Sequence, residues 1–114
     1  MTRRSVICSQ WDVVTVPFPF ADKPAAKRRP ALVLSNTTFN SGGYTVLAMI
    51  TTRGHRRWPG DSQIEEYSAA GLNLPCQVRL KVFTIDNRLL LKKIGRLAAN
   101  DTTTVKRHLH QFFS

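Results

Sequence analysis

The chain has few of the features that mark membrane proteins, exported proteins or disulfide-stabilised domains. Its longest unbroken apolar run is Val46–Ile50, far short of the roughly 20 residues that a membrane span needs. Arg3 and Arg4 are not followed by the apolar segment of a signal peptide. Cys8 and Cys76 are widely spaced and form no CxxC pair. We therefore expect a soluble, cytoplasmic protein with two free thiols.

The sequence is also poor in recognisable catalytic motifs. Its seven carboxylates are scattered, and the adjacent pair Glu65-Glu66 cannot face one site, which argues against a two-metal nuclease centre. No glycine-rich phosphate loop or HExxH motif is present. His108 and His110 are two residues apart on an expected helix and should point to different sides. A metal-free enzyme that works through arginine and hydroxyl groups remains open, because such a site leaves no spacing signature.

The abundant feature is positive charge. Seventeen Lys and Arg residues stand against seven Asp and Glu in 114 residues, a formal net charge of +10. Hydrophobic residues make up 42% of the chain, enough for one packed core, so we expect a single domain over residues 1–114. A surface this basic points to an anionic partner, either a nucleic acid or an acidic protein.

Short β-rich segments separated by turn signals dominate the chain. The segment 89–97 is ambiguous between helix and strand, and Gly95 favours a strand. Residues 67–72 should form a turn or helical corner. The remaining expected strands are 11–20, 30–35, 44–51, 62–65 and 76–85, and the expected loops are 21–29, 36–43 and 52–60.

The last segment, about 101–113, has the pattern of an amphipathic helix. Val105, Leu109, Phe112 and Phe113 form one apolar stripe at helical spacing, and Asp101 stands where an N-cap acceptor would. Several short strands followed by one helix predict a mainly β fold, an antiparallel barrel or twisted sheet with the helix packed on it.

Basic residues gather in two expected loops that could flank one groove. The second cluster is followed by Trp58, and cations interleaved with an aromatic ring suit single-stranded nucleic acid through phosphate neutralisation and base stacking. Two solvated loops on a basic protein would look the same. The clusters are Lys23, Lys27, Arg28 and Arg29, and then Arg53, His55, Arg56 and Arg57.

Two sequence blocks carry a family resemblance. WDVVTVPFPF at 11–20 and RPALVLS at 29–35 resemble the N-terminal signature of MazF/PemK-type toxins of bacterial toxin–antitoxin pairs, with Trp11 in place of a glycine. Weaker matches follow in the same order at 50–52, 78–79, 84–86 and 94–97, so the resemblance covers about residues 11–113.

The resemblance implies a small SH3-like antiparallel β-barrel of the CcdB/MazF type with a C-terminal α-helix, forming a homodimer. It implies a sequence-selective endoribonuclease that cleaves single-stranded RNA, usually mRNA, without a metal or other cofactor. The implied partners are this RNA and a cognate acidic, MazE-like antitoxin. Operator DNA would be bound only through the toxin–antitoxin complex.

The family pattern places the catalytic arginine at Arg29 and the catalytic hydroxyl at Thr51, with Thr52 as the neighbouring alternative. A planar guanidinium can grip phosphoryl oxygens and a hydroxyl can donate beside it, which suits attack by the RNA 2′-OH. The expected RNA-binding residues are Lys27, Arg28, Thr52, Arg53, His55, Arg56, Arg57, Gln77 and Arg79.

The sequence departs from the family pattern at Cys76, which stands where many relatives carry an aspartate before Gln77-Val78. The proton acceptor is therefore open, and His55 is the other loop candidate. Gln77 is expected to contact base edges and Arg79 phosphate.

Two alternatives predict different activities. A gyrase poison of the CcdB type shares the fold but acts through a Trp-Gly-Ile C-terminus, whereas this chain ends Phe112-Phe113-Ser114. A non-catalytic SH3-like module would bind nucleic acid or protein through the same basic loops. No helix-turn-helix is visible, so the chain alone is not expected to be a repressor.

Overall fold

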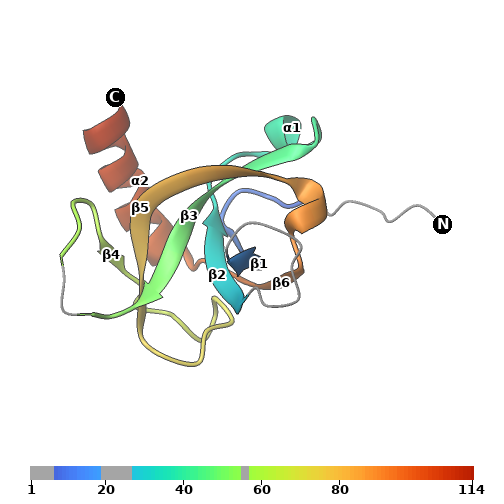
Figure 1. The fold of residues 1–114 in the computed structure, drawn as a ribbon. Helices are drawn as coiled ribbons and strands as arrows, with labels where there is room; N and C mark the ends of the chain where they lie inside the picture. The colour runs from blue at the N-terminus through green and yellow to red at the C-terminus, as the bar shows by residue number, and fades with distance from the viewer. Residues whose placement is uncertain (1–6, 19–26, 55–56) are drawn as a thin grey trace.

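A computed structural model describes residues 7–18, 27–54 and 57–114, and shows a curled antiparallel sheet with a helix at its end (Figure 1). The strand order is β4-β5-β3-β2-β1-β6, and all recorded pairings are antiparallel. In chain order the elements are β1 (Asp12–Phe18), β2 (Lys27–Val33), α1 (Thr37–Asn40), β3 (Tyr44–Thr52), β4 (Ser62–Gln63), β5 (Cys76–Asp86), the 3₁₀ turn η1 (Asn87–Leu89), β6 (Lys92–Arg96) and α2 (Ala99–Phe113).

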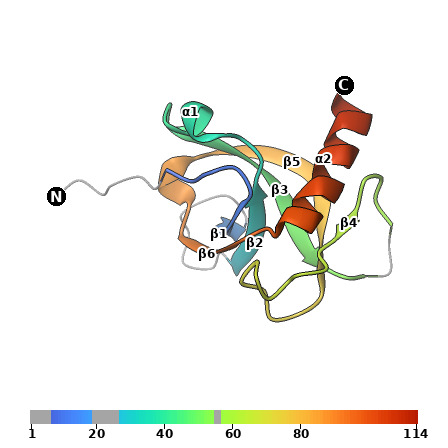
Figure 2. The ribbon, with the colours of Figure 1, turned by 180° about the vertical axis from the view of Figure 1, so that it is seen from behind.

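Apolar side chains fill both faces of the central strands, as short continuous apolar runs predict. On one face Val13, Leu32 and Ala48 pack with Val105 of α2, so the helix covers that face. On the other face Val14 and its neighbours form a second cluster, which includes Cys8. The expected mainly β fold with a C-terminal helix is confirmed, in the form of a half-barrel (Figure 2).

A register shift divides the long β3–β5 ladder. Ala48 is paired with Val82 but Met49 with Arg79, so β5 carries two extra residues at this point. Such a bulge bends the strand and increases its twist, and β5 arches over the sheet in Figure 1. Beyond the bulge the ladder continues to Thr51–Gln77, at the end of the sheet where β4 is added.

The ambiguous segment 89–97 is resolved as η1 followed by strand β6. Glycine is required in β6 because a Cβ on Gly95 would lie 2.3 Å from the backbone carbon of Ala70. The expected turn at 67–72 packs there, and Gly71 has a φ of +78°. The close approach of these two segments is therefore built on glycine.

Three expectations about local structure were wrong. The expected loop 36–43 contains α1, capped by Asn36, whose side chain accepts a hydrogen bond from the Phe39 N–H. The expected loop 21–29 ends early, since β2 begins at Lys27. Helix α2 begins at Ala99, so Asp101 lies inside its first turn and is not the N-cap.

The apolar stripe of α2 is buried only in its first part. Val105 is 1% exposed and Leu109 packs against the core, whereas Phe112 and Phe113 are 48% and 64% exposed. Both cysteines are free and buried. Within the described residues, none of the helices has the length and apolarity that crossing a membrane takes.

Candidate nucleic-acid interface

The expected catalytic residues lie near the same end of the sheet on neighbouring strands. Thr51 of β3 is paired with Gln77 of β5, which is paired in turn with Gln63 of β4. Because opposed residues of an antiparallel pair share a face, Thr51, Gln77 and Gln63 form a row across the sheet. On the other side of β3, the ladder with β2 ends at the pair Ala31–Met49, and Arg29 and Thr51 each lie two residues beyond that pair.

Among the described residues, the Thr51 hydroxyl is the one buried side-chain polar group that lacks a hydrogen-bond partner. Leaving such a group unsatisfied costs about 1–3 kcal/mol, and a native protein that retains one calls for a reason such as a catalytic role. The neighbouring Thr52 is exposed to solvent. The two threonines that the sequence left as alternatives are thus distinguished by their surroundings.

Three consecutive cations open β2 and are exposed: Lys27, Arg28 and Arg29. Arg29 lies opposite the buried Val16 of β1, so its backbone is held in the sheet. Among the residues that the structure describes, none of these three cations forms an ion pair with a carboxylate. Within the described ranges, no carboxylate therefore neutralises their charges.

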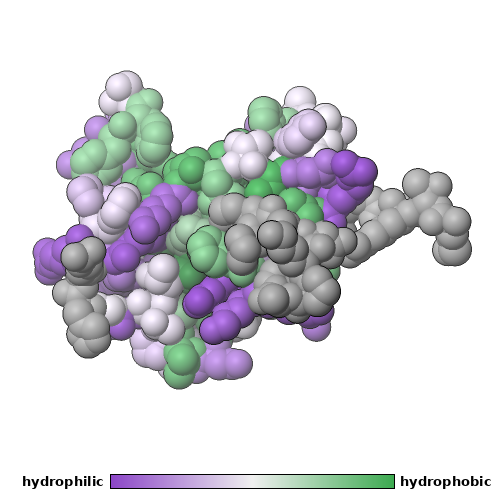
Figure 3. Space-filling view, in the orientation of Figure 1, coloured by the Kyte–Doolittle hydropathy of each residue, from purple (hydrophilic) through white to green (hydrophobic). Residues whose placement is uncertain are grey.

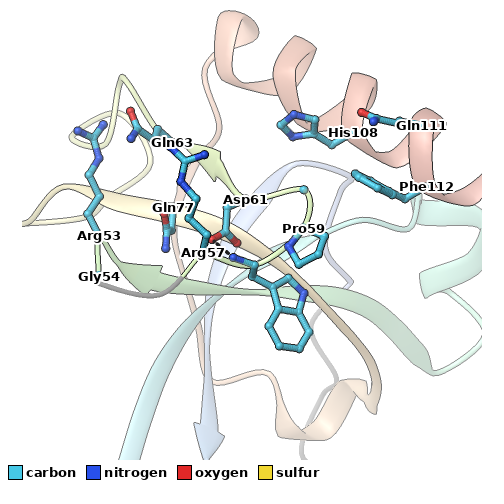
Figure 4. Close-up of a pocket in the computed structure, with 12 residues that line it drawn as sticks. Arg53, Gly54, Arg57, Pro59, Asp61, Gln63, Gln77, His108, Gln111 and Phe112 are labelled. Atoms are coloured by element: carbon cyan, nitrogen blue, oxygen red, sulfur yellow. Dashed lines mark hydrogen bonds between the residues drawn. The ribbon is translucent and has the colours of Figure 1, made fainter.

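A pocket of about 860 Å³ adjoins Gln77 and Gln63 of this row, between the loop after β3 and helix α2 (Figure 4). His108, Gln111 and Phe112 reach it from α2, and Gln63 and Gln77 from the sheet. Hydrophilic side chains gather over this part of the surface in Figure 3. The lining residues are Arg53, Gly54, Arg57, Trp58, Pro59, Gly60, Asp61, Gln63, Gln77, His108, Gln111 and Phe112.

Asp61 organises one wall of the pocket. Its carboxylate accepts hydrogen bonds from Arg79 Nε at 3.2 Å and Arg79 Nη2 at 3.0 Å, and both side chains are 14% exposed. The hydrogen bonds that Arg79 donates to Asp61 raise the pKa of Arg79. Asp61 also accepts the backbone N–H of Trp58 at 3.0 Å. Arg79, expected to contact phosphate, is therefore already paired with a carboxylate.

The Trp58 ring carries two cations. Lys81 Nζ lies 4.7 Å and the Arg79 guanidinium carbon 5.9 Å from the ring centroid, within cation–π range. The ring is 40% exposed. An exposed indole among cations is the arrangement that binds single-stranded nucleic acid.

Cys76 does not replace the missing aspartate as a base. It is 5% exposed, and burial raises the pKa of its thiol. The side chain is therefore a protonated thiol at neutral pH, whereas only the deprotonated thiolate could accept a proton from the 2′-OH. His108 lies at the pocket, with Nδ1 at 2.7 Å from Ser62 Oγ, whereas His110 is exposed to solvent.

The structure brings Arg53, Arg57 and Gln77 of the expected RNA-binding set into the pocket, and places Lys27 and Arg28 on β2. His55 and Arg56 lie outside the described residues. Sequence reasoning missed the pocket residues Asp61, Gln63, Gln111 and Phe112, and no spacing in the sequence connects them. The described ranges contain no group of three or more His, Cys, Asp or Glu side chains that could hold a metal ion.

The curled sheet with a C-terminal helix is the fold of the MazF class of small toxins. A Mycobacterium tuberculosis toxin, MazF-mt6, superposes with a TM-score of 0.70 at 22% identity, covering 88% of this chain and 93% of the toxin. A MazE–MazF complex from Deinococcus radiodurans gives a TM-score of 0.73 at 19% identity, covering 93% and 95%. A mycobacterial endoribonuclease in complex with its cognate antitoxin gives 0.69 at 15%, covering 92% and 91%.

Residues 9–113 match the family of PemK-like, MazF-like toxins of type II toxin–antitoxin systems, and the chain belongs to this family. The family resemblance of the N-terminal blocks is thereby confirmed. No curated protein matches the chain by sequence.

Proposed function

We propose that this chain is the toxin of a toxin–antitoxin pair and a metal-independent, sequence-selective endoribonuclease acting on single-stranded RNA, chiefly mRNA. One observation carries the proposal. The buried hydroxyl of Thr51 has no partner among the described residues, and both Thr51 and the exposed Arg29 of the next strand lie two residues beyond the last pair of the β2–β3 ladder. A donor hydroxyl near a guanidinium that has no carboxylate partner among the described residues suits a phosphodiester.

In the proposed reaction the 2′-oxygen attacks the adjacent phosphorus and the bond from phosphorus to the 5′-oxygen breaks. The 2′-OH proton passes to an acceptor, and the departing 5′-oxygen takes up a proton, which leaves a 2′,3′-cyclic phosphate and a 5′-hydroxyl. Negative charge grows on the phosphoryl oxygens in the transition state. Arg29 stabilises that charge through its fixed fork of donors, and the Thr51 hydroxyl donates beside it.

The remaining cations would hold the RNA. Lys27 and Arg28 extend the charge along β2, and Arg53 and Arg57 continue it at the pocket. Each phosphate that they neutralise releases counterions, so binding weakens as salt rises. Thr52, Gln77 and Arg79, together with His55 and Arg56, complete the proposed RNA-binding set.

The basic surface also suits an acidic antitoxin. The formal net charge of +10 favours an anionic peptide over the RNA-binding face, and a related fold occurs in a MazE–MazF complex. We propose that the toxin is a cytoplasmic homodimer neutralised by such an antitoxin, and that operator DNA is bound only by the complex.

The test is cleavage of a long mixed-sequence RNA in excess EDTA by wild type, Arg29→Ala and Arg107→Ala. Arg107→Ala is the control, because it removes the same single positive charge at an exposed position on α2 that does not line the pocket. We expect Arg29→Ala to cleave about 10²–10³-fold more slowly, equivalent to the roughly 3–4 kcal/mol of one oxyanion donor, and Arg107→Ala to retain most activity.

The product ends decide the mechanism. Cyclic phosphate or 3′-phosphate and 5′-hydroxyl ends support attack by the 2′-OH. RNA binding without cleavage by wild type would indicate the non-catalytic module and make gyrase the next target to assay. Cleavage by Arg29→Ala near the wild-type rate would refute the assignment of Arg29.

A further inference from the structure

Beside Arg53 and Arg57, the pocket between the loop after β3 and helix α2 holds carboxamides and aromatic rings that a phosphate site does not need. We infer, on the basis of the function proposed above, that it binds one nucleobase beside the scissile phosphate, and that Gln111 of α2 helps to select that base. The C-terminal helix would thus take part in RNA sequence recognition as well as in packing the core.

The pocket lies at the right distance from the proposed reaction. Gln77 is both the ladder partner of Thr51 and a pocket residue. Neighbouring strands are about 5 Å apart, so the pocket begins roughly one strand from the Thr51 hydroxyl. A nucleotide whose phosphate contacts Arg29 and Thr51 can place its own base, or that of its neighbour, in the pocket.

The lining groups can match a base edge. Three carboxamides enter the pocket from three elements: Gln63 from β4, Gln77 from β5 and Gln111 from α2. Each carboxamide both donates and accepts hydrogen bonds. Phosphate oxygens only accept, whereas the edges of bases carry both donors and acceptors, so this set selects for bases.

Aromatic rings provide the apolar part of the site. Trp58 is 40% exposed and Phe112 is 48% exposed, and both line the pocket. These rings expose aromatic surface to water beside polar amide groups. A nucleobase that stacks on them would cover that surface.

The pocket wall is fixed without a ligand. Gly60, with a φ of +80°, brings the loop so close that a Cβ there would lie 2.6 Å from Leu80 Cδ1 and 3.3 Å from Phe112 Cε2. Asp61 ties the Trp58 backbone to Arg79. The contact between His108 and the Ser62 hydroxyl joins α2 to β4. These contacts hold the part of the wall formed by Trp58, Gly60, Asp61 and α2 before a ligand binds, which favours selectivity.

The experiment maps cleavage sites in a randomised single-stranded RNA library for wild type, Gln111→Ala and Trp58→Ala. His110→Ala is the control for the first variant because His110 is the exposed neighbour on the same helix and does not line the pocket. Tyr44→Ala is the control for the second, since Tyr44 is an exposed aromatic at the far end of β3.

Wild type should prefer one base at one position within two nucleotides of the cut. Gln111→Ala should reduce that preference by about 5- to 100-fold, the range for one lost base contact. Trp58→Ala should weaken binding of the preferred RNA by about 5- to 150-fold. The two controls should keep the wild-type motif. An unchanged motif in both pocket variants would overturn the inference while leaving the ribonuclease intact.

Measuring the binding of RNA that cannot be cleaved tests the base pocket independently of the proposed ribonuclease activity. RNA oligonucleotides with 2′-deoxy substitution cannot be cleaved by 2′-OH attack, and titration with them should quench tryptophan fluorescence more in wild type than in Trp58→Ala, which retains Trp11. If wild type does not cleave RNA, the proposed function fails. Weaker binding by Gln111→Ala than by His110→Ala would still support the base pocket, and equal binding would refute it.

Discussion

Replacing Asp61 by Asn removes the carboxylate that occupies Arg79. In the folded protein Asp61 holds the guanidinium through two hydrogen bonds of 3.0 and 3.2 Å, with both side chains 14% exposed. An RNA phosphate that approaches Arg79 must compete with this internal anion. We expect Asp61→Asn to bind RNA more strongly than wild type at low salt, because the variant lacks the carboxylate charge that competes with phosphate for Arg79.

The structure sets the size of two effects of Asp61→Asn, one on folding stability and one on the salt dependence of RNA binding. Asn retains one acceptor oxygen but no charge, so the fold should lose about 1–2 kcal/mol of its free energy of unfolding, less than for a fully buried pair. One additional phosphate contact on a single strand makes the slope of log K against log salt steeper by about 0.7. Between 50 and 200 mM salt the variant should therefore lose about 2.6-fold more affinity than wild type loses.

The assay is fluorescence anisotropy with a 2′-deoxy-substituted RNA at several salt concentrations, with urea denaturation of the same samples. Asp86→Asn is the matched control. Asp86 pairs with Arg88 at 2.8 Å, but this pair lies on the surface, with the Arg88 side chain 72% exposed. A salt slope that is unchanged in Asp61→Asn, or that rises equally in Asp86→Asn, would refute the competition between Asp61 and phosphate for Arg79.

Three further predictions concern buried side-chain groups: the Thr51 hydroxyl, the Asp101 carboxylate and the two cysteine thiols. Thr51→Val should raise the free energy of unfolding by about 1–3 kcal/mol, since it removes a buried hydroxyl without a described partner, while RNA cleavage falls at least about tenfold; normal cleavage would contradict its catalytic role. Asp101→Ala should lose about 2–3 kcal/mol in urea denaturation, because its oxygens accept two backbone N–H groups at 2.9 Å; a loss under 1 kcal/mol would contradict this. Burial raises the pKa of Cys8 and Cys76 above 9.0, so their stabilising effect is complete below pH 9 and is lost as pH rises. The free energy of unfolding between pH 8 and 10.5 should thus fall more steeply for wild type than for the double alanine variant, and parallel curves would count against this linkage.

The central strands could be predicted from sequence because their signal is local. The run Ala31–Leu34 is apolar on both faces, and its residues indeed contribute to both cores. The same is true of Val46–Ile50 in β3. In contrast, Asp101 looked like an N-cap from its position alone. Its carboxylate instead accepts the N–H groups of Glu65 and Glu66, 36 and 35 residues away, which no local pattern specifies.

The candidate site likewise contains residues that the sequence predicted and contacts that it did not predict. Family-specific blocks of sequence pointed to Arg29 and Thr51, and their placement on adjacent strands follows from the order and register of those strands. The pairing of Arg79 with Asp61 could not be seen, since it depends on how the loop before β4 folds back on β5. The exposure of Phe112 was also hidden, because helical periodicity shows which face is apolar but not where the supporting sheet ends.

By itself, then, the sequence determined the strands, the terminal helix, the positive charge and the family, since each depends on residue type and short-range spacing. Only the tertiary structure decided the surroundings of individual side chains: the Thr51 hydroxyl without a partner among the described residues, the Asp61–Arg79 pair, and the pocket that Gln63, Gln77 and Gln111 line together. The pair and the pocket join segments that are far apart in the chain. They arise from strand register, the β5 bulge and the packing of α2 on the core, and none of these is encoded in a local pattern.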